Sequence, residues 1–129
     1  MIVAPIPVRT WLVDTVAALT LQNLTDFKTD GCGGVIAYLG GNLTKQLIAD
    51  AHSLDLGIVP VNYSHKEGWM PTAALGAQDA KQSADHMNAL GIPMLGLDDW
   101  CDIEGCGGVP TAYCEAWCAA LAADGAGRV

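Results

Sequence analysis

The feature that most constrains the fold of this chain is a repeated alternation of short apolar runs with longer, helix-like stretches. The apolar runs are TWLVDT (10–15), GVIAYLGG (34–41), GIVPVNYS (57–64) and LDDWCDIEG (97–105). The stretches that follow them cover residues 19–31, 42–57, 72–91 and 110–125. Strands that alternate with helices at this pitch predict βαβ units, parallel pairing and right-handed crossovers.

Four such units predict an α/β fold that is TIM-barrel-like, with a parallel sheet forming half of a barrel. The length of 129 residues suits one domain over 1–129, and the two prolines near the start predict an extended N-terminal arm over 1–9. Half a barrel exposes two strand edges and an apolar inner face. We therefore expect a homo-oligomer or a larger assembly; a flattened open sheet and a trimmed chain are the alternatives.

Glycine and proline place some of the boundaries between these elements. Gly57 and Gly91 closely follow the last apolar residues of their helical stretches, as C-terminal caps do. Pro60 falls inside the third apolar run, where it cannot donate a ladder hydrogen bond. It is tolerated there near a bulge, or where its nitrogen faces away from a neighbouring strand.

Charge and hydropathy exclude several classes of function. The net charge is −8 and no Lys/Arg cluster is present, so we expect no nucleic-acid partner. No run reaches the roughly 18 apolar residues of a membrane span, and MIVAPIPVRTW lacks the layout of a signal peptide. The GCGG turns precede strands, which is the reverse of the order that a phosphate cradle needs.

The five cysteines lie at positions 32, 101, 106, 114 and 118. Neither C-x-x-C pairs nor a nearby histidine is present, so zinc spacing is lacking and no metal or other cofactor is expected. We interpret the cysteines as buried thiols, with one or two disulfides or a metal site as alternatives. Cys32 and Cys106 each lie in a GCGG turn, and the sequence alone does not decide whether these two turns come close together.

An acidic pair, Asp102 and Glu104, ends the fourth apolar run directly before a glycine turn. Residues two apart on a strand face the same side, so both carboxylates are predicted at the carboxyl-end rim of the sheet. The alternative is that they cap the next helix or bind the amides of the glycine turn. Asp98 and Asp99 form a second pair, expected in the loop that enters this strand, or at the rim if the strand ends earlier.

Polar and aromatic residues end the second and third runs at the same rim: Tyr38, Asn62, Tyr63 and His65. Tyrosine stacks on sugar faces, and Asn and His donate to hydroxyls, so this lining favours a saccharide. The alternatives are ordinary packing for the tyrosines and a solvated loop position for His65. His52 and His86 are predicted on helix surfaces. Trp69 is predicted either to close over the rim or to anchor its loop.

The order of GVIAYLGG, LTKQLIADAHSLDLGIVPVNYS, ADHMNALGIP, WCDIEG and YCEAWCAALAADG resembles a known family. It is similar to the glycoside-hydrolase-like (β/α)8 domains of actinobacterial and bacteriophage proteins, relatives of the family 25 lysozyme-like muramidases. The resemblance covers nearly the whole chain but only the first four βα units of that barrel. It implies a phage or extracellular setting and a cell-wall polysaccharide, peptidoglycan, as partner.

The same resemblance implies roles for three carboxylates. In the muramidases an aspartate ends the first strand and a D-x-E ends the fourth, which correspond to Asp14 and to Asp102 with Glu104. Glu104 is then expected as the general acid, Asp102 as the group that stabilises charge or orients an N-acetyl group, and Asp14 as its support. The alternative function is a non-catalytic structural or carbohydrate-binding module that other chains complete.

Overall fold

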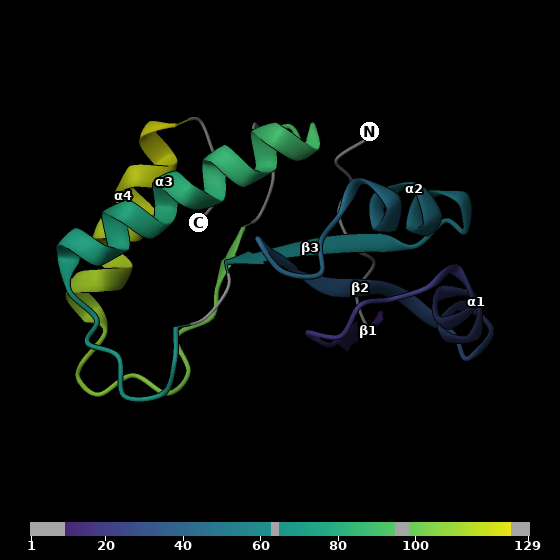
Figure 1. Cartoon of the computed structure of the whole chain (residues 1–129), viewed down its shortest axis with the longest axis horizontal. Coiled ribbons are helices and arrows are strands. Elements are labelled where there is room, and N and C mark those ends of the chain that lie inside the picture. The colour runs from purple at the N-terminus through teal and green to yellow at the C-terminus, as the bar shows by residue number, and fades with distance from the viewer. Residues whose placement is uncertain (1–9, 63–64, 95–98, 125–129) are drawn as a thin grey trace.

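A computed structural model describes residues 10–62, 65–94 and 99–124. Its elements are β1 (Trp11–Asp14), α1 (Leu21–Thr29), β2 (Cys32–Leu39), α2 (Lys45–Ser53), β3 (Gly57–Asn62), α3 (Ala73–Leu90), β4 (Trp100–Cys101) and α4 (Thr111–Ala123). The strands pair in parallel in the order β1-β2-β3-β4 (Figure 1). The prediction of an α/β half-barrel with a four-stranded parallel sheet is confirmed, while the predicted arm over 1–9 lies outside the described residues.

The β2–β3 pair forms the centre of the sheet and divides its side chains between two faces. It runs in register from Gly34 opposite Gly57 to Leu39 opposite Asn62. On what we call the helix face, one core joins the sheet to α1, α2 and α3, and it includes Leu24, Val35, Ala37, Leu39, Leu47, Ala51 and Met87. On the other side, the inner face, a smaller apolar cluster consists of Leu12, Ile36, Tyr38, Val59 and Val61.

Threonine side chains begin three of the helices. Thr20, Thr44 and Thr72 are the N-caps of α1, α2 and α3, and each hydroxyl accepts a hydrogen bond from the backbone N–H three residues later. This bond satisfies one of the amides that a helix start leaves unpaired. The starts of these helices are therefore determined locally, whereas α4 follows Pro110 and has no side-chain cap.

The two glycine caps that the sequence predicted have different outcomes. Gly91 ends α3 in the left-handed conformation with φ 76°, which confirms the prediction there. The prediction for Gly57 is wrong, because α2 already ends at Ser53 with Leu54 as its C-cap, and Asp55 takes the positive φ of 53°. The Leu56 N–H bonds back to the Ala51 carbonyl, so the turn is complete before Gly57 begins β3.

Two features of the third and fourth strands refine the sequence prediction. Pro60 pairs with Ala37 inside β3, but it lies outside the short β3–β4 ladder, which pairs Val61 and Asn62 with β4. The fourth strand, expected within 97–105, consists of Trp100–Cys101 alone among the described residues. Beyond Cys101 the chain leaves the sheet, because its next segment pairs with the loop that precedes α3.

Helices α3 and α4 lie side by side at one end of the molecule (Figure 1). Their contact forms a second core, which contains Ala80, Ala84, Tyr113, Trp117 and Leu121. Gly76 allows the close approach, because a Cβ at this position would lie 2.2 Å from the backbone oxygen of Tyr113. Among residues 10–62, 65–94 and 99–124, none of the helices has the length and apolar character to cross a bilayer, as the sequence predicted.

We predict that Gly76→Ala lowers the free energy of unfolding by about 2 kcal/mol, because the new methyl group forces α3 and α4 apart. Helix propensity alone would raise it by about 1 kcal/mol, so the sign of the change is diagnostic. Urea denaturation followed by circular dichroism measures the effect. Ala77→Gly, at an exposed neighbouring position, calibrates the propensity. A stabilised Gly76→Ala variant would contradict the close packing.

Candidate functional site

The ends of β1 and β2 bring a carboxylate and a phenol together on the inner face. Asp14 is the last residue of β1, and Tyr38 lies one residue before the end of β2. The Tyr38 hydroxyl donates a hydrogen bond to Asp14 Oδ1 at 3.0 Å. This contact agrees with the predicted placement of both residues at the carboxyl-end rim. We refer to Asp14, Tyr38, Trp100, Asp102 and Glu104 as the inner-rim site.

Asn42, in the turn after β2, fixes the backbone around this contact. Its side-chain oxygen accepts the N–H of Tyr38 at 2.8 Å, and its amide nitrogen donates to the carbonyls of Thr15 at 2.7 Å and Ala17 at 2.9 Å. One side chain therefore links the loop after β1 to the turn after β2. Sequence reasoning assigned Asn42 no role at the site, because its partners lie 25 and 27 positions away in the chain.

The pKa of Tyr38 depends on burial and on more than one carboxylate. Burial raises the pKa of Tyr38 to about 12, and the hydrogen bond to Asp14 and the negative charges of Asp14, Asp102 and Glu104 add to the increase. The phenol therefore stays protonated through the neutral range and remains a hydrogen-bond donor. Asp14 contacts this hydroxyl directly, whereas Asp102 and Glu104 act on it through their negative charge alone.

Asp102 and Glu104 reach this environment from a loop, which corrects the expectation that both lie on a strand. Asp102 Oδ1 accepts the backbone N–H of Glu104 at 3.1 Å, so the first carboxylate holds the turn that carries the second. Asp102 is half-buried and Glu104 is exposed. The cause is the short β4, which ends at Cys101 and releases the chain from the two-residue alternation of a strand.

Trp100 is a member of the inner-rim site that sequence reasoning missed. It pairs with Val61, whose side chain belongs to the inner-face cluster, so the indole lies on that face too. The neighbouring Cys101 packs on the opposite side, in the core between α3 and α4. The Trp100 side chain is 50% exposed. The available signal was its position two residues before Asp102 on a predicted strand.

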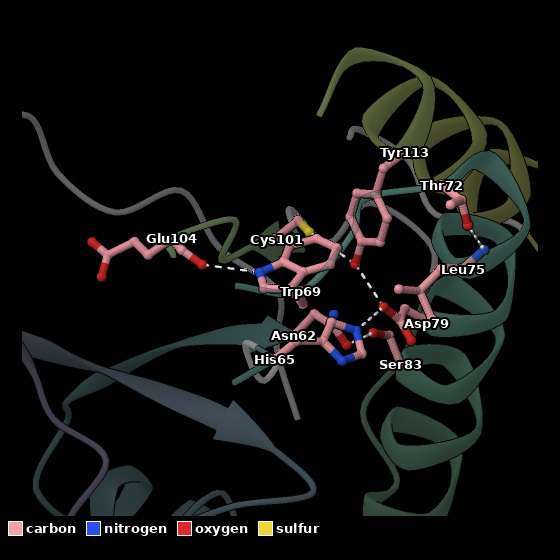
Figure 2. A network of polar contacts seen from close by, with 10 residues as sticks. All are labelled: Asn62, His65, Trp69, Thr72, Leu75, Asp79, Ser83, Cys101, Glu104 and Tyr113. Atoms are coloured by element: carbon pink, nitrogen blue, oxygen red, sulfur yellow. Dashed lines mark hydrogen bonds and ion pairs between the residues drawn. The ribbon is translucent and has the colours of Figure 1, made fainter. Parts of the chain in front are cut away.

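Asn62 and His65 lie on the helix face and not at the inner rim, which corrects their expected placement. The register turns Asn62 away from Val61 and Tyr38, and its side-chain oxygen accepts a hydrogen bond from Ser83 on α3 at 2.8 Å. His65 Nε2 lies 2.5 Å from Asp79 Oδ2, and its side chain is 34% exposed (Figure 2). His65 is therefore tied to α3 and is not a freely solvated loop residue.

The carboxyl edge of the sheet is hollowed on either side of the turn after β2. One hollow of about 360 Å³ is lined by Val16, Ala18, Gly40, Gly41 and Asn42. A second, of about 220 Å³, is lined by Leu39, Gly40, Asn62, His65, Asp79, Gln82 and His86. His52 and His86 are exposed, as predicted for both, although the His86 ring packs closely over Gly40.

Asp99 is buried on the approach to β4 and does not reach the rim. It is 4% exposed, and neither carboxylate oxygen has a hydrogen-bond partner among the described residues. Burial raises its pKa to about 7, and the nearby backbone N–H of Trp100 offsets part of that increase. Its expected role in substrate binding is therefore not supported by its position. Tyr63 and Asp98 lie outside the described residues.

The cysteines remain thiols with limited exposure. All five are free and half-buried. Cys32 begins β2 whereas Cys106 follows β4, so the two glycine turns lie at opposite ends of the sheet and do not bring these thiols together. Burial and the neighbouring Cys118 and Cys106 raise the pKa of Cys114, which disfavours the thiolate that metals bind. Within the described ranges, no three metal-binding side chains gather.

Comparison with known proteins supports the fold and no activity. No model of a known family matches the chain, and no curated protein matches it. It is similar to a crystal structure, at 1.07 Å, of an uncharacterized protein of B. stearothermophilus, with a TM-score of 0.75 and 24% identity. The match covers 90% of this chain and 57% of that one. At this identity the likeness shows a shared fold.

We predict that Asp99 makes the protein less stable as pH rises from about 4 to about 7. The unfolded chain releases this proton near pH 3.8, whereas the folded chain keeps it until about pH 7. The free energy of unfolding therefore falls across this window, by about 4 kcal/mol for a pKa difference of about three units. Asp99→Asn should remove that part of the decrease, whereas Asp30→Asn at an exposed site should not. Urea denaturation at pH 4 and pH 8 measures it, and equal pH dependence in Asp99→Asn and wild type would refute the assignment.

Proposed function

We propose that the inner-rim site engages bacterial cell-wall glycan, as a glycoside-hydrolase-like domain related to family 25 lysozyme-like muramidases. The observation that carries the proposal is the hydrogen bond from the Tyr38 hydroxyl to Asp14 at the carboxyl end of the sheet. The negative charges of Asp102 and Glu104 also contribute to the raised pKa of Tyr38. The four-stranded sheet would correspond to the first half of a TIM-type barrel. Its carboxyl end is where such barrels keep their sites.

The chemistry of the rim suits a sugar. Carboxylates accept hydrogen bonds from the hydroxyl groups of a sugar, and the single Tyr38 hydroxyl proton is donated to Asp14, which holds that carboxylate in place. Trp100 adds a half-exposed aromatic face on the same side of the sheet, on which the apolar face of a sugar ring can stack. A site with carboxylate acceptors and an aromatic face, in a chain of charge −8, favours a neutral polyhydroxylated ligand over an anion.

Hydrolysis requires one carboxylic acid to protonate the leaving oxygen while another carboxylate stabilises the developing positive charge. In this proposal Glu104 is the acid, because it is exposed at the tip of the loop and can reach a bound ligand. Asp102 is restrained by the Glu104 N–H, and Asp14 by the Tyr38 hydroxyl, so these two carboxylates are the fixed partners. Muramidase-type cleavage of glycosidic bonds in peptidoglycan is the reaction that this division of roles would perform.

The second candidate is glycan binding without hydrolysis, in a carbohydrate-binding or structural module of a phage or cell-surface assembly. The exposure of Glu104 favours it, since no described side chain holds that carboxyl group in a water-excluded position. The aromatic face of Trp100 and the Asp14–Tyr38 contact serve binding equally well without a catalytic acid. Catalysis and binding therefore need separate measurements.

For catalysis, we expect release of reducing ends from purified peptidoglycan by the wild-type chain, and a loss of about 100-fold or more in Glu104→Gln. Glu115→Gln is the matched control, because Glu115 is an exposed glutamate on α4. An active Glu104→Gln variant would exclude this residue as the acid. An inactive wild-type chain would exclude hydrolysis by this chain and leave the binding measurement to decide.

For binding, we expect soluble peptidoglycan fragments to shift the NMR signals of the Trp100 indole and of residues around Tyr38. Trp100→Ala should weaken the affinity by about 10-fold, because an aromatic contact contributes on the order of 1 kcal/mol. Trp11→Ala is the control, since Trp11 is 77% exposed but lies at the start of β1, away from the rim. Equal affinity of all three proteins would place any glycan site elsewhere.

We also propose self-association through the sheet edges. Within the described residues β1 and β4 each have a single strand neighbour, and the exposed Trp11 lies on the β1 edge. Light scattering across micromolar concentrations should then report a dimer or a larger species. A monomer at every concentration would contradict the edge argument and would leave the glycan proposal standing.

A further inference from the structure

The helix face contains a buried carboxylate that the proposed glycan site does not use. Asp79 lies in the second turn of α3 and is 3% exposed. Its Oδ2 atom accepts hydrogen bonds from the Tyr113 hydroxyl at 2.8 Å and from His65 Nε2 at 2.5 Å (Figure 2). A buried carboxylate without such donors would be strongly destabilising, so these two contacts determine where the side chains of His65 and Tyr113 must lie.

The two donors come from different parts of the chain and hold one indole ring between them. His65 lies in the loop after β3, and Tyr113 lies in the first turn of α4. The Trp69 ring centroid is 4.8 Å from that of His65 and 4.9 Å from that of Tyr113, with an edge-on arrangement against the tyrosine. Burial and the bond to Asp79 raise the pKa of Tyr113, so the phenol remains a donor at every physiological pH.

Trp69 transmits this placement to the loop that carries Glu104. Its indole Nε1 donates to the backbone oxygen of Glu104 at 3.0 Å (Figure 2). The Gly68 N–H donates to the Gly105 carbonyl and the Gly107 N–H donates to the Trp69 carbonyl, each at 2.7 Å. The loops before α3 and α4 are thus joined by consecutive bonds, and the Glu104 side chain extends away from the ring cluster.

We propose that Asp79 is a positioning residue for Glu104, acting through His65, Tyr113 and the indole of Trp69. The carboxylate orients both rings, the rings hold the indole, and the indole holds the backbone of residue 104. The first three steps concern the fold alone. Only the last step, in which the placement of Glu104 affects glycan affinity or cleavage, rests on the proposed function.

A purely structural role for Asp79 in joining α3 to α4 makes a different prediction. Those helices already pack through Gly76, Ala80, Trp117 and Leu121, none of which needs the carboxylate. Loss of Asp79 should therefore loosen the joined loops and leave the helix contact intact. If Asp79 served only to join α3 to α4, its loss would instead loosen the two helices together with the loops.

The test is amide hydrogen exchange by NMR on the full chain, with Asp79→Asn as the variant. We expect exchange at Gly68 and Gly107 to become about 10-fold faster or more, because the restraint on Trp69 is weakened. The Trp69 indole N–H signal should shift, while α3 and α4 amides such as those of Ala84 and Leu121 keep their protection. Asp85→Asn is the control: it removes the same charge from the same helix, where Asp85 is exposed and pairs with Lys81 at 3.0 Å.

Unchanged exchange at Gly68 and Gly107, or equal loosening of loops and helices, would overturn the proposal. If Asp79→Asn does not fold, Tyr113→Phe removes one of the two donors and keeps the ring. A smaller acceleration of amide exchange is then expected at Gly107. Glycan affinity is then compared between wild type and the variant. If the loops loosen but the wild-type chain binds no glycan, the positioning network stands and the proposed function fails.

Discussion

The parallel register between β2 and β3 is the constraint on which the rest of the structure depends. It pairs residues from Gly34 with Gly57 through Leu39 with Asn62, and both faces of this pair are covered by apolar side chains. A slip by one residue would exchange the two faces of a strand. Tyr38 would then leave Asp14, and Asn62 would leave Ser83. The polar contacts on the two faces are therefore consequences of a single alignment that the apolar residues specify.

That alignment separates two groups of polar side chains at one edge of the sheet. Tyr38 near the end of β2 bonds to Asp14 on the inner face, and Asn62 at the end of β3 bonds to Ser83 on the helix face. The loops after β3 and β4 then join across the end of the sheet through Trp69. The proposed glycan chemistry thus stands on the inner face, whereas the contacts that hold its loop come from the helix face.

The sequence predicted the strands and helices well, because the alternation of apolar runs with helical stretches is a local signal. It also placed Asp14 and Tyr38 correctly at one rim, since the carboxyl ends of parallel strands share an edge. It wrongly placed Asp102 and Glu104 on a strand, because the length of β4 depends on what the following loop bonds to. It missed Asp79 because the partners of this carboxylate lie 14 and 34 positions away, and no short pattern links them. It expected Asn62 at the rim because residues at a strand end were assigned to one face without counting the alternation.

The bond from Trp69 to position 104 is made with a main-chain oxygen, which every amino acid possesses. The loop can therefore keep its shape whichever side chain occupies that position. The hydrogen bond that holds this loop does not depend on the side chain at position 104. A single substitution there can therefore remove or restore the carboxylic acid and leave the loop in place. Under the proposed function, a variant of this chain that cleaves its ligand and a variant that only binds it would therefore share one backbone at this loop.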